Sequence, residues 1–101
     1  MMTRHINNFI ECLDEQRYFD AHEALEIVWF PRRFEDDNEV KLLKGFINAA
    51  VSFELAKRGK HEQSKKVWQN YLKYKELLHK TNSPHIKLYQ QTAIYLESKQ
   101  V

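Results

Sequence analysis

Turn-forming residues and cysteine are scarce in this chain of 101 residues, which contains two glycines, two prolines and one cysteine. So few glycines and prolines disfavour a β-sandwich or β-barrel, which needs many tight turns. A lone cysteine, Cys12, excludes a framework of intrachain disulfides and gives no sign of an oxidising compartment. No apolar run approaches the length of about 18 residues that a membrane span requires.

Aromatic residues, by contrast, are plentiful at 13% of the chain, with 43% hydrophobic residues overall. A chain of this length forms one domain, which we place at residues 1–101, and it buries roughly two-thirds of its unfolded surface without a metal or disulfide. The first residues lack the apolar core of a signal peptide. We therefore expect a cytoplasmic protein.

Hydrophobic periodicity predicts helices in the first third of the chain. Ile6, Phe9, Ile10 and Leu13 recur at i, i+3, i+4 and i+7, which predicts an amphipathic first helix. A second helix is predicted between two local signals. Asp20 is the expected N-cap, with Glu23 completing a capping box, and the helix ends at Phe30 because Pro31 follows. In the charged loop after it, Phe34 is the residue able to turn inward.

The third predicted helix is apolar on nearly every side between residues 40 and 56, which is typical of the middle helix of a bundle. Asp36, Asp37 or Asn38 is expected to cap its start, and a left-handed Gly59 its end. Gly45 lowers helix propensity by about 1 kcal/mol relative to alanine. We expect another element to approach closely there, with Trp29 as the candidate.

Two further helices are predicted in the second half. A long fourth helix carries the apolar positions Val67, Trp68, Tyr71, Leu72 and Leu78 beside a basic outer face. Ser83 as N-cap and Pro84 at the first helical position predict the start of a fifth helix. The sequence therefore predicts an all-α fold, a compact bundle of about five helices with a buried central third helix.

Several motifs resemble those of a bacterial and archaeal family named domain of unknown function 309. They are His-Glu-x-x-Glu-x-x-Trp at residues 22–29, Lys-Gly-x-Ile at residues 44–47 and Arg-Gly at residues 58–59. The resemblance covers roughly residues 7–72 and implies an all-helical fold. Leu55 stands near a position where members of the family often carry a histidine.

The second helix carries the most informative group of polar residues. His22 and Glu26 are one helical turn apart on one face, and Trp29 follows almost one turn later. A histidine and a carboxylate at this spacing can face one divalent metal ion, but a third ligand is required from elsewhere. Glu54, a carboxylate within the apolar third helix, is the candidate. As the alternative to metal binding, Glu54 can pair with His22, Lys44 or Arg58, or be exposed at the edge of the bundle. The predicted metal ligands are thus His22, Glu26 and Glu54.

Each of these residues also has a structural interpretation. Glu23 can cap the helix with Asp20, His22 can bond to a carboxylate, and Glu26 can pair with Lys44. An enzyme of the metal-dependent or acid–base hydrolase type would draw its catalytic residues from His22, Glu23, Glu26 and Lys44. The sequence contains no complete catalytic set, and no cofactor is predicted beyond a possible divalent metal.

The net charge of +2 hides an asymmetry between the two halves. Residues 1–56 carry six Lys or Arg against eleven Asp or Glu, a net −5, whereas residues 57–101 carry ten against three, a net +7. Such a chain can pair head to tail with a second copy, or bind nucleic acid weakly through its basic half. Its halves can also face each other within the fold, or the basic side can be a solvated helix surface. We expect a small binding or interaction protein that forms a homo-oligomer. Its His/Glu cluster is expected to be mainly structural, and membrane binding is not expected.

Overall fold

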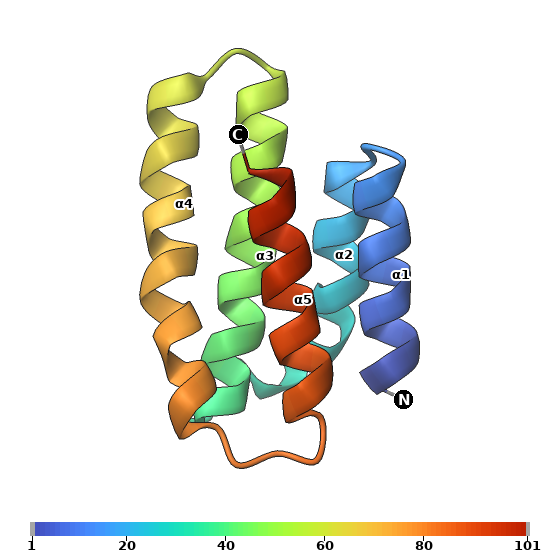
Figure 1. Ribbon diagram of the computed structural model, residues 1–101, viewed down its shortest axis with the longest axis vertical. Coiled ribbons are helices and arrows are strands. Elements are labelled where there is room, and N and C mark those ends of the chain that lie inside the picture. Colours follow the sequence, from blue (N-terminus) through green and yellow to red (C-terminus); the bar gives the residue numbers. More distant parts are fainter. Residues whose placement is uncertain (1, 101) are drawn as a thin grey trace.

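The computed structural model describes residues 2–100, which form five α-helices and two short 3-10 helices with no strand in that range (Figure 1). In chain order the elements are α1 (Met2–Asp14), α2 (Tyr18–Trp29), η1 (Phe30–Arg32), α3 (Asn38–Lys57), α4 (His61–Lys75), η2 (Glu76–Lys80) and α5 (Ile86–Lys99). The all-α fold predicted from the sequence is confirmed.

The helices form two antiparallel hairpins joined side by side (Figure 1). Helix α1 pairs with α2, and α3 pairs with α4. The two hairpins meet where α2 packs against α3. Helix α5 covers one face of this arrangement and contributes the buried residues Tyr89, Thr92, Ala93 and Leu96. No helix in the described part of the chain combines the length and apolarity needed to cross a membrane.

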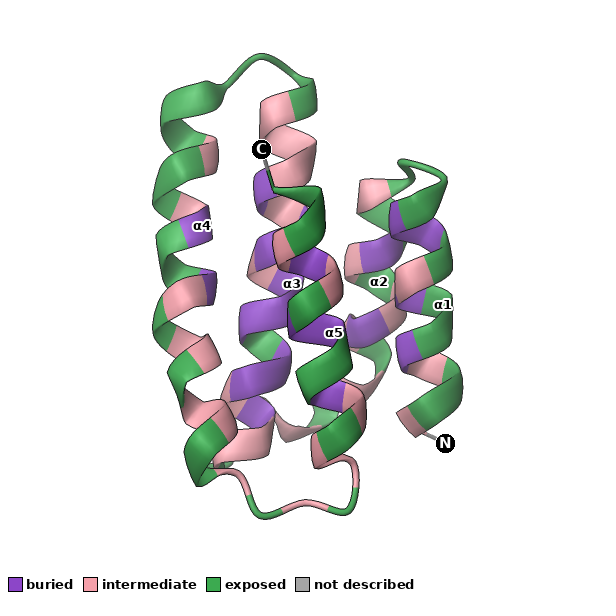
Figure 2. Ribbon diagram, in the orientation of Figure 1, coloured by how far each residue is buried: buried purple, intermediate pink, exposed green. Residues whose placement is uncertain are grey.

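Helix α3 is buried along most of its length, as the sequence predicted (Figure 2). Leu42, Leu43 and Phe46 are completely buried, and Ala49 and Ala50 let neighbouring helices approach closely. The helix starts at a true N-cap, because the Asp37 carboxylate accepts hydrogen bonds from the amides of Glu39 and Val40 at 2.7 and 3.4 Å. It ends in a turn where Gly59 has a φ of 77°, which is the left-handed conformation that the sequence predicted.

Gly45 does provide a close helix contact, but the predicted partner was wrong. A Cβ atom at this position would lie 2.7 Å from the Cβ of Tyr74, so α4 and not Trp29 occupies the space beside the glycine. Trp29 instead lies half-buried at the edge of the bundle, where the Lys44 ammonium is 5.9 Å from its ring centre. Gly45 therefore fixes how closely α3 and α4 pack.

Hydrogen bonds and rings hold the other end of the α3–α4 pair. The Ser52 hydroxyl donates to the Ser64 carbonyl and the Ser64 hydroxyl donates to the Ser52 carbonyl, both at 2.8 Å. Trp68 and Tyr71 are buried, with ring centres 4.7 Å apart. Both belong to the core, as predicted, so neither is available to stack on a nucleic-acid base.

Three predicted helix boundaries were wrong. Helix α2 begins at Tyr18 and has no side-chain cap, because Asp20 lies inside its first turn and bonds to Arg17. Helix α4 stops at Lys75, and Leu78 belongs to η2. Helix α5 starts at Ile86 rather than Pro84, since the Ser83 hydroxyl accepts the His85 amide and forms a turn before the helix.

Replacing Gly45 with alanine tests the close contact between α3 and α4. Helix propensity alone would make Gly45→Ala stabilising by about 1 kcal/mol. The added methyl group overlaps the rigid base of the Tyr74 side chain, and overpacking of this kind costs about 1–3 kcal/mol. We expect a lower midpoint of urea denaturation. A midpoint higher than that of the unmodified protein would contradict the packing described here.

Candidate functional site

The predicted His22–Glu26 pair is formed on α2. The Nε2 atom of His22 lies 3.0 Å from a carboxylate oxygen of Glu26, and the two side chains are 25% and 39% exposed. The ring of Phe19 lies 5.9 Å from the imidazole, one turn earlier on the same face. Glu26 thus pairs with the histidine of its own helix, while Lys44 faces Trp29.

The third predicted metal ligand is elsewhere. Glu54 lies near the C-terminal end of α3 and accepts a hydrogen bond from Arg58 at 2.6 Å. Within residues 2–100, no three His, Cys, Asp or Glu side chains come together in a group suited to a metal ion. His22, Glu26 and Glu54 therefore do not converge, and only the His22–Glu26 pair remains of the predicted set.

A shallow groove of about 730 Å³ runs between α1 and α2 beside this pair. Its walls carry the carboxylates of Glu11, Asp20, Glu23 and Glu26 together with the apolar side chains of Ile27 and Phe30. The one cation in the wall, Arg17, is already bound to Glu15 at 2.7 Å and to Asp20 at 3.0 Å. The predicted capping box is absent, because α2 has no side-chain cap. Glu23 lines this groove instead.

Large apolar side chains are exposed along α2 and the segment after it. Phe19, Ile27 and Phe30 are 60%, 64% and 51% exposed, and their spacing of i, i+8 and i+11 places them on one side of the helix. Phe34, which the sequence allowed to turn inward, is 88% exposed. The Arg33 guanidinium lies 3.6 Å from the Phe30 ring centre and 4.5 Å from that of Phe34. We call Phe19, Glu23, Glu26, Ile27 and Phe30 the outer face of α2.

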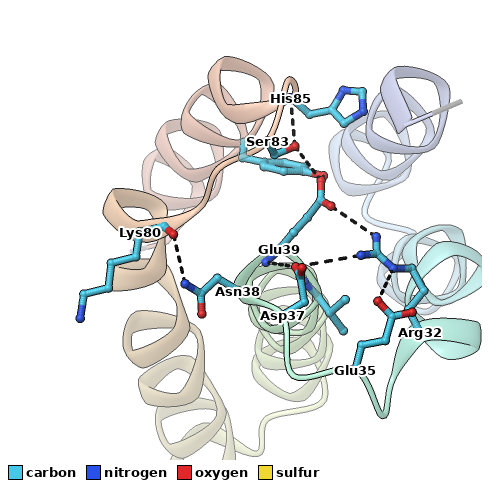
Figure 3. A network of polar contacts seen from close by, with 10 residues as sticks. Arg32, Glu35, Asp37, Asn38, Glu39, Lys80, Ser83 and His85 are labelled. Atoms are coloured by element: carbon cyan, nitrogen blue, oxygen red, sulfur yellow. Dashed lines mark hydrogen bonds and ion pairs between the residues drawn. The ribbon is translucent and has the colours of Figure 1, made fainter.

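A polar network that sequence reasoning missed lies beyond the C-terminal end of α2, around Glu39 (Figure 3). One oxygen of the Glu39 carboxylate accepts hydrogen bonds from the hydroxyls of Tyr89 at 2.6 Å and Ser83 at 2.8 Å. The other oxygen accepts from Arg32 at 3.3 Å. This one side chain therefore joins η1, α3 and the start of α5.

The network sets the ionisation of its members. Burial opposes ionisation of Glu39, but the hydrogen bonds from Tyr89, Ser83 and Arg32 outweigh it and hold the pKa of that carboxyl below its usual range. Burial and the bond to Glu39 raise the pKa of Tyr89. Arg32 is held in place by a further ion pair with Glu35 at 3.1 Å. Both oxygens of the Glu39 carboxylate accept hydrogen bonds from other elements of the bundle, which indicates a structural role.

A comparison with known protein families shows which of them this chain is related to. Residues 6–67 match the family described as Domain of unknown function (DUF309), and this match covers more than half of the chain. The chain belongs to the DUF309 family. The match includes α2, the outer face of α2 and all of α3. It ends within α4, and α5 lies outside it. No curated protein and no solved structure matches the chain.

Replacing Glu39 with glutamine tests the network. Glu39→Gln keeps the shape but removes a charged acceptor, so we expect the free energy of unfolding at neutral pH to fall by about 1–3 kcal/mol. Because the Glu39 pKa is lowered by folding, its contribution is present above the unfolded pKa of about 4.3 and is lost as the pH falls through the folded value.

Urea denaturation at neutral and acidic pH measures both effects. The difference between the unmodified protein and Glu39→Gln should shrink as the pH falls. Glu35→Gln is the matched control, since it removes an exposed partner of the same Arg32 and should cost less than about 1 kcal/mol. Equal stability of Glu39→Gln and the unmodified protein at neutral pH would refute the role given to the network.

Proposed function

We propose that this DUF309 protein acts by binding rather than by catalysis, and that it associates head to tail with a second copy of itself through the outer face of α2. The observation that carries the proposal is the exposure of Phe19, Ile27 and Phe30 beside carboxylates with few cationic partners. Contiguous apolar side chains rimmed by polar ones are typical of protein interaction surfaces. The buried thiol of Cys12 fits a reducing compartment, and we expect the protein in the cytoplasm.

Charge favours a basic occupant for this face. Neither Glu11 nor Glu23 forms an ion pair with another described residue, so the groove keeps uncompensated negative charge. Two copies placed α2 against α2 would bring these carboxylates together, which disfavours the symmetric arrangement. The complementary surface is on the chain itself, because residues 57–101 carry a net charge of +7.

The outer side of α4 is the partner surface that we propose. Lys66 and Lys73 are exposed and lie two turns apart on this side of the helix, about 10.5 Å along its axis. Glu23 of α2 and Phe30, the first residue of η1, are likewise seven residues apart. The aliphatic stems of lysines can cover aromatic rings while their ammonium groups reach carboxylates or the ring faces. In this proposal, the ion pair between His22 and Glu26 fixes these two side chains beside the contact surface and takes no part in catalysis.

Sedimentation analysis across a range of protein and salt concentrations tests this contact. We expect a concentration-dependent oligomer that weakens as salt rises. Ile27→Asp should weaken association by about tenfold or more, because truncation or charging of a central interface residue costs about 2 kcal/mol. Ile94→Asp is the matched control, since Ile94 is 71% exposed on α5, outside both surfaces.

Charge reversal tests the proposed pairing. Glu23→Lys and Lys66→Glu should each weaken association alone, whereas a mixture of the two variants should recover it, because one copy's altered α2 then meets the other copy's altered α4. A protein that stays monomeric at every concentration would contradict the proposal, as would an oligomer that both variants leave intact. Stoichiometric binding of a divalent metal that is lost in a folded His22→Ala variant would favour the enzyme alternative instead.

A further inference from the structure

A second cleft, of about 500 Å³, is separate from the groove between α1 and α2 and is lined by several basic side chains. The α1–α2 turn, the α3–α4 turn and the end of α5 all lie at one end of the bundle (Figure 1). Each contributes to the cleft: Tyr18 follows the first turn, Lys57 and His61 flank the second, and Lys99 ends α5. Neither the motifs at residues 22–29 nor the proposed self-association uses these residues.

The lining of this cleft is basic. Lys57, His61, Lys65 and Lys99 line it, and no carboxylate does. Lys99 reaches Asp14 at 3.4 Å and Lys57 donates to the Gln16 carbonyl at 3.2 Å, whereas Lys65 forms no ion pair within residues 2–100. The cleft thus concentrates positive charge, which favours an anion.

The start of α4 adds to this charge. Helix α4 begins at His61 without a side-chain cap, so no side chain at the N-cap accepts from the amides of His61, Glu62 and Gln63 at the positive end of the helix dipole. Glu62 lies in the same turn but does not line the cleft. Lys65 is one turn further along the same side of the helix as His61.

The floor of the cleft is aromatic and rigid. The rings of Tyr18 and Phe53 are half-buried, with centres 5.7 Å apart. Phe53 in turn packs on the buried Trp68 at 5.7 Å. Beside the rings, the hydroxyls of Ser52 and Ser64 are fixed by their mutual bonds between α3 and α4. The two ring planes are inclined at 49°, so a flat organic group can stack on one ring and touch the edge of the other while an attached anion reaches the lysines.

We propose that this cleft binds a small organic phosphate of the nucleoside monophosphate class. Its phosphate is held by Lys65, His61 and the first turn of α4, and its base lies against Tyr18 and Phe53. Charged phosphate contacts supply affinity, and the aromatic floor selects a ligand with a flat ring. The volume falls within the range of small-molecule sites, which is about 300–1,000 Å³.

Titration calorimetry and NMR at low salt with adenosine monophosphate as the probe test the proposal, with adenosine and inorganic phosphate as comparison ligands. We expect saturable binding of the monophosphate, weaker binding of either part alone, and amide shifts confined to the residues that line the cleft. Lys65→Ala should weaken binding about tenfold, the loss expected for one charge-assisted hydrogen bond. Lys87→Ala, which removes an exposed lysine of α5 outside the cleft, should bind as the unmodified protein does.

Three results would overturn the proposal. One is the absence of saturable binding at millimolar probe. The second is equal weakening by Lys65→Ala and Lys87→Ala. Binding would then depend on the overall positive charge of residues 57–101 and not on the cleft. Tight binding of a single-stranded oligonucleotide without binding of the monophosphate would also contradict it. Both lysines are exposed, so both variants should retain the far-ultraviolet circular dichroism of a folded helical protein.

Discussion

Burial of α3 on nearly all sides is the constraint on which the rest of the structure depends. Leu42, Leu43 and Phe46 are completely buried, and α3 packs against α2 and α4 along its length. Helix α5 covers a further side, where the Phe46 and Tyr89 ring centres are 6.0 Å apart. Gly45 lets α4 approach closely at one level, and the Ser52–Ser64 pair joins the same two helices further along. Removing any of these neighbours would expose apolar side chains of α3, whose polar side is the narrow row of Lys41, Lys44 and Asn48.

The same constraint leaves other helix faces without an internal partner. Helix α2 buries Ala21 and Leu25 against the bundle, which turns Phe19, Ile27 and Phe30 toward solvent. Helix α4 buries Trp68 and Tyr71, which leaves its lysines outside. The two surfaces proposed to pair between copies of the chain are therefore the outer sides of helices whose inner sides are needed for the core. Acidic charge on the first and basic charge on the second make them complementary.

Sequence periodicity was sufficient to predict the fold class, the buried α3 and the core positions of Trp68 and Tyr71, because these depend on apolar spacing along one helix. It could not identify Tyr74 as the partner of Gly45, since that pairing depends on how two helices are aligned. The same limit explains Glu54, which meets Arg58 of its own helix instead of His22. The Glu39 network joins residues up to 50 positions apart, and no local spacing in the sequence links Glu39 to Ser83 or Tyr89.

Amide hydrogen exchange followed by NMR tests the central role of α3 most directly. Amides between Leu42 and Ala50 should exchange only when the whole protein unfolds, so their protection should equal the global free energy of unfolding. Amides of α1 and of the outer turns of α4 should exchange faster, through local opening. Faster exchange in the middle of α3 than in α1 or α4 would contradict an account in which α3 organises the bundle.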